Sequence, residues 1–295
     1  MAPGVPVVSR PQVLFLTTLA MLAFAGNSIL CRLALKHTAI DPASFTAIRL
    51  IAGAVTLWLV VRMRTPAAAA PGNWPSAAAL FIYAATFSFS YVSLPAAAGA
   101  LLLFGAVQVT MISYGLWAGE RPGKLQTLGL CAACAGLVAM LLPGLAAPPV
   151  QGALLMLAAG VAWGVYSLRG KGGGDATAVN AGNFLRAAPM AACLGLALLP
   201  WASLDIAGFW YAVSSGALAS GLGYAVWYSA LRGLTASTAA SVQLSVPVIA
   251  AAGGVMLLDE PPTLRLLLCS IAILGGIALV ILARPQPAIQ APLRR

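Results

Sequence analysis

The sequence contains the same pattern twice. Glu120 is followed by Arg-Pro and an apolar run that contains Gly136, and Glu260 is followed by Pro-Pro and an apolar run that contains Gly276. In both pairs the second copy lies about 140 positions after the first. Self-similarity at one fixed spacing indicates that a structural unit was duplicated. We therefore expect a chain built largely from two copies of one unit.

Between its few polar breaks the chain is almost continuously apolar. Hydrophobic residues make up 61% of it and charged residues only 7%, and the mean hydropathy is +0.95. This composition is typical of a protein embedded in lipid. The breaks leave about ten runs, each close to the ~20 residues that a helix needs to cross the hydrocarbon layer. Because the runs do not alternate between apolar and polar residues, spanning strands are excluded, and we predict an all-α polytopic membrane protein.

Ten transmembrane helices are predicted from these runs. In the loop before the second helix, Asp41 is expected to act as the N-cap and Pro42 to take the first helical position. The predicted helices span about residues 12–36, 42–61, 76–94, 96–117, 125–142, 151–168, 177–199, 207–231, 235–258 and 263–283.

Each copy of the duplicated unit holds five helices, which is an odd number. The second copy must then enter the membrane from the opposite side, so the two repeats are predicted to be inverted. Inverted repeats are related by a pseudo-two-fold axis in the membrane plane, which places a shared cavity near the midplane and permits outward-open and inward-open arrangements. We assign residues 1–147 to the first five-helix repeat, 148–283 to the second, inverted repeat and 284–295 to a cytoplasmic tail.

The net charge of +10 reflects membrane topology rather than nucleic-acid binding, because the basic residues form neither a basic face nor a platform interleaved with aromatic rings. If the N-terminus is cytoplasmic, the far side receives only Lys36, Arg265 and at most also Arg32. This asymmetry follows the positive-inside rule, so both termini are predicted to be cytoplasmic. The basic residues on the cytoplasmic side are Arg10, Arg62, Arg64, Arg121, Lys124, Arg169, Lys171, Arg232, Arg284, Arg294 and Arg295.

The sequence offers no obvious metal or cofactor site. The five cysteines, including the Cys131-x-x-Cys134 pair, lie inside apolar runs, where a free cysteine behaves as a small hydrophobic residue. His37 is the only histidine. The segment from Lys171 to Asp175 lacks the preceding strand and the Gly-Lys-Ser/Thr ending of a phosphate-binding loop, so we interpret it as a flexible linker. We expect no cofactor and no bound metal.

Several motifs share their order with a known family. They are Phe24-Ala25-Gly26-Asn27, its counterpart Ala162-Trp163-Gly164-Val165-Tyr166, Arg49 after Pro42, and Gly119-Glu120 followed by Gly129 and Gly136. With the ten spans and the duplication, nearly the whole chain resembles the EamA-type transporters of the drug/metabolite transporter superfamily. The resemblance implies a ten-helix exporter of small metabolites in the bacterial inner membrane, with the fifth and tenth helices peripheral and the others around a cavity. Within the family, YddG-like exporters of aromatic amino acids are the most similar type. The chain departs from the family at Phe24, where tryptophan is frequent.

Polar and aromatic side chains in the middle of the predicted helices are the candidates for substrate binding. Trp163 lies between Gly160 and Gly164, a pattern that fits a close helix crossing, an aromatic cavity wall or both. Gln108 and Gln243 lie in corresponding helices, and their amides need partners in a cavity or on a neighbouring helix. The residues assigned to substrate binding are Phe24, Asn27, Tyr83, Gln108, Trp163, Tyr166, Tyr224 and Gln243.

A second set of intramembrane residues is assigned structural or gating roles. Arg49 and Arg186 cannot lose their charge, so each needs acceptors or water. They either recognise a substrate carboxylate or act structurally, by snorkelling or by bonding to backbone carbonyls, and we favour the structural role. Pro247 frees a backbone carbonyl and is a candidate bend, as are the glycines of the 207–231 helix. Gly164, like most glycines in membrane helices, is a packing position.

All six acidic residues fall at helix ends or in loops. No carboxylate at midspan is available to relay a proton or to bind sodium, so we expect facilitated diffusion or exchange. The same pattern disfavours a cationic substrate. We therefore predict a monomeric, non-enzymatic transporter whose partners are the lipid bilayer and a neutral or zwitterionic metabolite, most simply an amino acid, aromatic ones included. The alternatives are a channel or a passive scaffold and, less favoured, a membrane-embedded enzyme, for which there is neither a His-Glu-x-x-His motif nor a midspan Asp pair.

Overall fold

The computed structural model describes residues 10–64, 71–118, 123–142, 147–170, 175–231, 234 and 242–283. Every regular element within these ranges is a helix, which confirms the all-α prediction. The elements are α1 (Arg10–His37), α2 (Pro42–Arg64), α3 (Trp74–Tyr91), α4 (Ala96–Trp117), α5 (Lys124–Leu141), α6 (Val150–Arg169), α7 (Ala176–Ala197), η1 (Leu199–Trp201), α8 (Ile206–Ser214), η2 (Ser215–Leu222), α9 (Gly223–Leu231), α11 (Ser245–Leu258) and α12 (Leu264–Leu282).

Five of these helices are long and apolar enough to cross a membrane. They are α1, α2, the Ala96–Gly115 part of α4, α5 and α6, and shorter apolar helices lie at Ser245–Leu258 and Leu264–Val280. Large hydrophobic side chains such as Phe15 and Met63 are exposed on the outside of the protein. An apolar exterior of this kind is unfavourable in water and suits contact with lipid tails.

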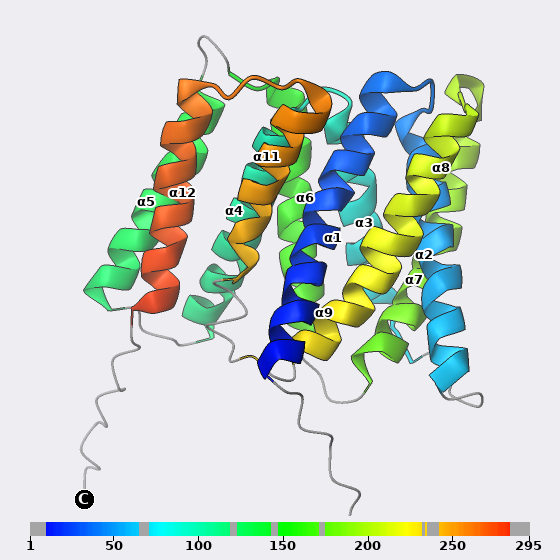
Figure 1. The fold of residues 1–295 in the computed structure, drawn as a ribbon, viewed down its shortest axis with the longest axis horizontal. Coiled ribbons are helices and arrows are strands. Elements are labelled where there is room, and N and C mark those ends of the chain that lie inside the picture. Colours follow the sequence, from blue (N-terminus) through cyan, green and yellow to red (C-terminus); the bar gives the residue numbers. More distant parts are fainter. Residues whose placement is uncertain are drawn as a thin grey trace, which may run out of the picture.

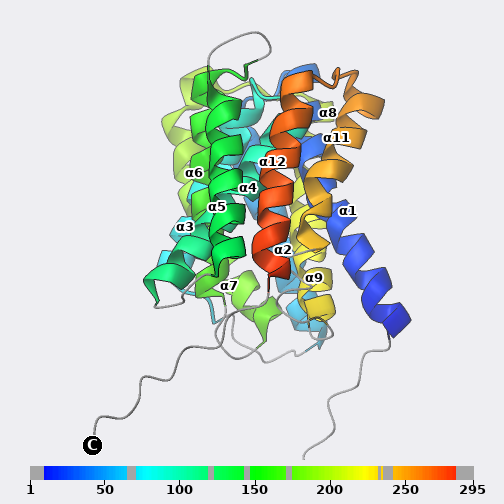
Figure 2. The ribbon, with the colours of Figure 1, turned by 90° about the vertical axis from the view of Figure 1, so that its left-hand side faces the viewer.

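The helices stand side by side in one bundle, with α5 and α12 paired at one edge (Figures 1 and 2). A Cβ atom built on Gly129 would lie 2.5 Å from the carbonyl oxygen of Gly276, and a Cβ atom on Gly276 would lie 2.5 Å from the carbonyl oxygen of Gly129. Only residues without side chains allow the two backbones to approach so closely. Gly129 and Gly276 therefore allow the close packing of α5 against α12.

The start of α1 and the end of α12 lie at the same end of the bundle (Figure 1). We call this the lower end, and it carries Arg10, where α1 begins, and Leu282, where α12 ends. The opposite, upper end carries His37, at the end of α1, and Val150, at the start of α6. Helices α1 and α6 therefore run in opposite directions through the bundle (Figure 1).

Asp41 caps α2 as the sequence predicts. Its Oδ1 accepts hydrogen bonds from the backbone N–H groups of Ala43 and Ser44 at 2.9 and 3.0 Å, and Pro42 takes the first helical position. Its Oδ2 accepts from the backbone N–H of Ser203 at 3.0 Å, so the same carboxylate ties the α1–α2 loop to the segment before α8. Partial burial alone would raise the pKa of Asp41, but the hydrogen bonds from Ser44, Ser203 and Ala43 outweigh it and lower the pKa.

The helix predicted at 207–231 is present but not regular. It consists of α8, the π-helical segment η2 and α9 in direct succession. At Gly216 the wider coil lies against α2 so closely that a Cβ atom would clash with the carbonyl oxygen of Arg49. Gly221 faces the side chain of Thr56 in the same way, with a Cβ contact of 3.1 Å. These glycines are packing positions between η2 and α2.

The helix predicted at 235–258 differs from the structure in its described part. Residues 235–241 lie outside the described ranges, and α11 begins only at Ser245, after a break at Leu244. Pro247 therefore lies in the first turn of α11 rather than at midspan, where it was expected. Proline has no N–H for the carbonyl of Gln243, four residues earlier, which explains why the regular helix starts here. By contrast, α7 continues through Pro189.

Candidate functional site

A cavity lies between helices from the first and second halves of the chain. Its volume is about 20 Å³, which is room for about one water molecule and far below the several hundred Å³ of a typical metabolite site. In this conformation the cavity is closed around its own side chains. Its wall consists of Phe24, Asn27, Ser28, Tyr83, Phe87, Leu103, Phe104, Trp163, Ala219, Tyr224 and Gln243.

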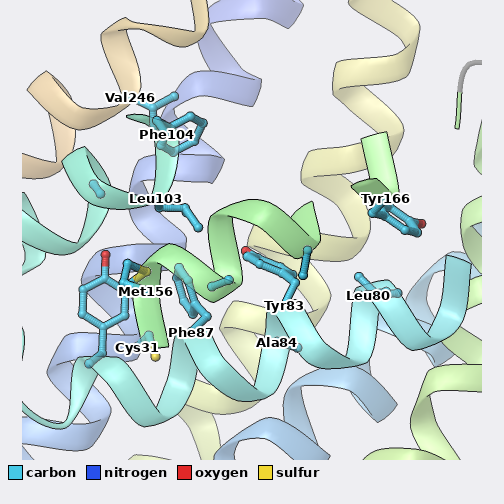
Figure 3. Close-up of a cluster of buried hydrophobic side chains, with 14 of the residues drawn as sticks. Cys31, Leu80, Tyr83, Ala84, Phe87, Leu103, Phe104, Met156, Tyr166 and Val246 are labelled. Atoms are coloured by element: carbon cyan, nitrogen blue, oxygen red, sulfur yellow. The ribbon is translucent and has the colours of Figure 1, made fainter. Parts of the chain in front are cut away.

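Six of the eight residues assigned to substrate binding contribute to this wall, and two do not. Gln108 is buried on α4 away from the wall, and Tyr166 is buried on α6. Figure 3 shows Tyr83 and Phe87 projecting from the same side of α3, with Tyr166 farther from Phe87 than Tyr83 is. The six lining residues are Phe24, Asn27, Tyr83, Trp163, Tyr224 and Gln243.

Trp163 is the centre of the aromatic part of the wall. Its ring centroid lies 4.9 Å from that of Tyr83, 5.1 Å from that of Tyr224 and 5.5 Å from that of Tyr166. Phe24 closes the far side, with its ring edge-on to Tyr224 at 5.8 Å. These separations are those of favourable aromatic pairs. Rings from α1, α3, α6 and α9 thus form one continuous surface.

The glycines beside Trp163 allow α6 to pack closely on α4. A Cβ atom on Gly160 would lie 2.5 Å from the Cβ of Ala106 and 2.7 Å from the carbonyl oxygen of Leu103, and one on Gly164 would lie 2.9 Å from the Cβ of Thr110. The glycine pattern therefore makes a close helix crossing, and Trp163 itself faces the cavity. Both interpretations of this motif describe parts of the same arrangement.

A chain of hydrogen bonds runs along one side of the cavity. The Oγ of Ser215 donates to Oδ1 of Asn27 at 2.6 Å, and Nδ2 of Asn27 donates to the hydroxyl oxygen of Tyr83 at 3.3 Å. The same oxygen accepts a second hydrogen bond, at 3.0 Å, from Nη2 of Arg49. Asn27 is thus satisfied on both sides of its amide, as a buried amide in hydrocarbon requires. The Tyr83 oxygen accepts twice, and its own proton is free to point elsewhere.

Arg49 is the most unusual group of this site. It is 1% exposed, and its guanidinium carbon lies 5.2 Å from the ring centroid of Tyr83 and 4.8 Å from that of Phe87. Its Nε and Nη1 have no hydrogen-bond partner within the described ranges. Cation–π contacts contribute about 0.5–2 kcal/mol, whereas burying an ion costs several kcal/mol unless an opposite charge compensates for it. The burial of the Arg49 side chain therefore has an unfavourable net free energy.

Tyr166 belongs to a separate polar cluster between α6 and α7. Its hydroxyl donates to Oδ1 of Asn180 and accepts from Nδ2 of Asn183 at 3.3 Å. Oδ1 of Asn183 in turn accepts from the backbone N–H of Asn73, at the start of α3, at 2.9 Å. This cluster satisfies interhelical groups and lies beside the cavity rather than in its wall. Arg186, half-buried on α7, donates from Nη1 to the carbonyl oxygen of Gly182 at 2.8 Å.

A second, larger cavity of about 440 Å³ lies near the upper end, between the α5/α12 pair and the neighbouring ends of α4 and α11. Its polar wall includes Arg32 and Glu260, which form an ion pair with an Nε–Oε1 distance of 3.2 Å. Nη1 of Arg32 also donates to the carbonyl oxygens of Tyr91 and Val92 at 2.8 and 3.1 Å. Oε2 of Glu260 accepts from the backbone N–H of Ala96, at the start of α4, at 2.7 Å. Within this pair the charges of Arg32 and Glu260 compensate each other.

Sequence reasoning missed two kinds of residue. The cavity also contains the apolar side chains of Phe87, Leu103 and Phe104, which look like ordinary core residues in the sequence. Phe87 could have been found, because it lies one helical turn after Tyr83 and therefore shares its face. Glu260 was placed only at a helix end, and its pairing with Arg32 was not foreseen. Glu120, its counterpart in the first half, and the 171–174 and 284–295 segments lie outside the described residues.

Comparisons with known proteins relate this chain to a family of membrane transporters. The EamA-like transporter family matches residues 150–282. The chain is 61% identical over 274 residues to the uncharacterized protein PA1977 of Pseudomonas aeruginosa, a match that covers 92% of this chain and 96% of that protein. A solved crystal structure with 20% sequence identity has the same fold, with a TM-score of 0.65 over 92% of this chain and 98% of that one. Residues 150–282 therefore belong to the EamA-like transporter family.

Proposed function

We propose that the protein exports small neutral or zwitterionic metabolites, most simply amino acids with apolar or aromatic side chains, by alternating access. The observation that carries the proposal is the cavity around Trp163, whose wall combines six aromatic residues with the amides of Asn27 and Gln243. Rings can pack against an apolar side chain, and a few amides can orient polar groups. A YddG-like preference for aromatic amino acids is the most specific form of this proposal.

Two inverted five-helix repeats would supply the two arrangements that alternating access needs. The packing of the helices supports such repeats. If α1 to α5 correspond to α6, α7, the α8–α9 column, α11 and α12, the contact of α1 with α9 matches that of α6 with α3, and the contact of α1 with α11 matches that of α6 with α4. Each of α2, α4 and α5 also packs against its own counterpart, α7, α11 and α12. A pseudo-two-fold axis between the two halves of the chain predicts this pattern of helix contacts.

The distribution of charge supports an orientation with the lower end in the bacterial cytoplasm. Among the described residues, the lower end carries several arginines and a lysine, whereas Lys36 and Arg265 lie at the upper end, together with the acidic residues of that end. Positively charged loops are retained on the cytoplasmic side of the membrane. The basic residues of the lower end are Arg10, Arg62, Arg64, Lys124 and Arg169.

A carrier fits the closed cavity better than a channel does. At about 20 Å³ the cavity holds no metabolite without a change of conformation, and an alternating carrier passes through closed states of this kind. The described acidic residues lie at helix ends, and Glu260 is already paired with Arg32. An uncoupled mechanism is therefore part of the proposal, with the substrate gradient setting the direction of a monomeric carrier.

Counterflow in liposomes tests the proposal. Purified protein is reconstituted, the vesicles are loaded with unlabelled phenylalanine, and uptake of labelled phenylalanine is followed without any ion gradient. We expect saturable, transient accumulation that protein-free vesicles lack. Linear, non-saturating uptake would favour a channel, and accumulation that requires a proton or sodium gradient would contradict the uncoupled mechanism.

A further inference from the structure

The guanidinium of Arg49 lies directly behind the cavity wall. Its Nη2 donates to the hydroxyl oxygen of Tyr83 at 3.0 Å, and its cationic carbon lies 4.8 Å from the ring centroid of Phe87. Tyr83 and Phe87 both line the cavity. One side chain layer therefore separates a permanent positive charge from the space in which a ligand would bind.

No acidic residue of the described ranges compensates this charge. The titratable side chains that interact with Arg49 are Tyr83, Tyr224 and Cys31, all neutral at pH 7 by their ordinary chemistry. The ion pair found in the described residues belongs to Arg32 and Glu260. Two of the nitrogens of Arg49, Nε and Nη1, find no acceptor among these residues. A fully buried arginine without an opposite charge would be stabilised by an anionic ligand that binds nearby.

The hydroxyl of Tyr83 extends the preference for an anionic group into the cavity. Because its oxygen accepts hydrogen bonds from both Asn27 and Arg49, its remaining function is to donate its own proton. A donor polarised by a neighbouring cation forms a strong hydrogen bond to an anionic oxygen. Arg49 and Tyr83 together thus present positive charge and a proton donor, and the wall offers no carboxylate that would bind an ammonium group.

We propose that Arg49, with the hydroxyl of Tyr83, is the carboxylate-binding site of the chamber, so that a substrate is recognised by a carboxylate at one end and an apolar ring at the other. The ring would pack beside Trp163, which lies 4.9 Å from Tyr83 between ring centroids. The ammonium group of an amino acid is then dispensable. This inference rests on the proposed function: it requires a carboxylate on the substrate and admits amphipathic carboxylates without an amine beside the zwitterionic amino acids.

The test uses two probes that differ only in the proposed recognition group. 3-Phenylpropanoate and its neutral amide, 3-phenylpropanamide, share the ring and the chain, and neither carries an amine. Their dissociation constants are measured by calorimetry on the purified full chain in detergent, for the wild type, Arg49→Gln and Arg62→Gln. Arg62→Gln is the matched control, because it makes the same substitution on the same helix, where Arg62 lies over the surface ring of Trp58.

We expect the wild type and Arg62→Gln to bind the carboxylate roughly 10- to 100-fold more tightly than the amide, as loss of a charge-assisted hydrogen bond predicts. In Arg49→Gln the ratio should fall to about 1. A ratio near 1 in the wild type, or a ratio that persists in Arg49→Gln, would overturn the inference. If phenylalanine counterflow is nevertheless saturable, the proposed function survives that result. If neither counterflow nor binding of either probe occurs, both proposals are wrong.

A second variant keeps the inference testable should Arg49→Gln fail to give a monodisperse protein. Tyr83→Phe removes the proton donor and leaves Arg49 and the ring in place. We expect its carboxylate-to-amide ratio to fall several-fold below that of the wild type, with binding of the amide unchanged. An unchanged ratio in Tyr83→Phe would remove the hydroxyl from the proposed site.

Discussion

The protein buries two arginines in contrasting ways. Arg32, near the upper end, is bonded to the carboxylate of Glu260 and to two backbone carbonyls, whereas Arg49, beside the central cavity, is bonded to the hydroxyl of Tyr83 and lies against two rings. The first arrangement stabilises the fold, because each partner neutralises the other. The second stabilises nothing by itself, since the desolvation of its charge is not compensated. A membrane protein keeps such a group where function requires it.

Removing the acid of the paired region should have the largest effect. Glu260→Gln leaves Arg32 as a second buried cation without a counterion, and breaking a buried pair in this way lowers the free energy of unfolding by about 3–5 kcal/mol. Thermal or denaturant unfolding in detergent measures the loss. The control is Asp259→Asn, one residue earlier, where the side chain is exposed and the left-handed backbone (φ 51°) suits asparagine. Equal stability of Glu260→Gln and the wild type would remove the distinction between the two arginines.

Replacing the unpaired Arg49 by an apolar residue should stabilise the protein. Arg49→Met replaces a buried, uncompensated charge by an apolar side chain of similar length, and we expect the free energy of unfolding to rise by about 1–3 kcal/mol. Binding of 3-phenylpropanoate should be lost in the same variant, because stability and function compete at this position. A loss of stability instead would mean that Arg49 is compensated by interactions that its described neighbours do not provide. Arg32→Met, in the paired region, is expected to destabilise.

The aromatic wall should contribute less than either charge. Trp163→Ala removes the ring that contacts Tyr83, Tyr166 and Tyr224, and each aromatic pair contributes about 0.5–1.5 kcal/mol. We therefore expect an approximately 3- to 10-fold weaker competition by phenylalanine in the counterflow assay. Leucine, which has no ring, should be affected less. Trp210→Ala, at an exposed position on α8, is the matched control and should leave competition unchanged.

The smallest effect is expected at Asp41, a partly buried carboxylate in the loop before α2. The pKa of Asp41 is lowered in the folded protein, so its contribution to stability is present above the ordinary aspartate pKa of about 4 and is lost as the pH falls through the lower folded-state value. Asp41→Asn should therefore be less stable than the wild type near neutral pH, and the two should converge below about pH 4. Melting temperatures between pH 7 and pH 3 measure this difference. A gap that stays constant over this range would show that the carboxylate charge is not involved.

The fold could be predicted from the sequence wherever local chemistry decides. Uninterrupted apolar runs give helices in lipid, and Asp41 followed by Pro42 marks a helix start on its own. A bend was expected at Pro247, whereas the structure has a helix start there. A proline can bend a helix or begin one, and the neighbouring helices decide which. The π-helical coil of η2 left no distinct signal, since its glycines also fit a regular packed helix.

The site could be predicted only in part, because facing a cavity is a tertiary property. Gln243 lines the wall and Gln108 does not, although the sequence predicts both to lie in corresponding helices. The pairing of Arg32 with Glu260 joins residues 228 positions apart, and no local sequence pattern around either residue predicts its partner. Arg49 was expected to snorkel or to bond to backbone carbonyls rather than to recognise a substrate carboxylate, and in the structure it donates to a tyrosine hydroxyl.

The wide coil of η2 has a consequence for where the rings of α9 point. Successive residues of a regular α-helix are rotated by about 100° around the axis, so a residue accommodated as an insertion shifts the angular phase of everything that follows it. Tyr224 is the second residue after this segment, and its ring contacts those of Phe24 and Trp163. Rewinding η2 as a regular α-helix with the same number of residues would rotate Tyr224 about the helix axis and leave the helix intact. The geometry of the aromatic wall is therefore set by eight residues of backbone winding as much as by the rings themselves.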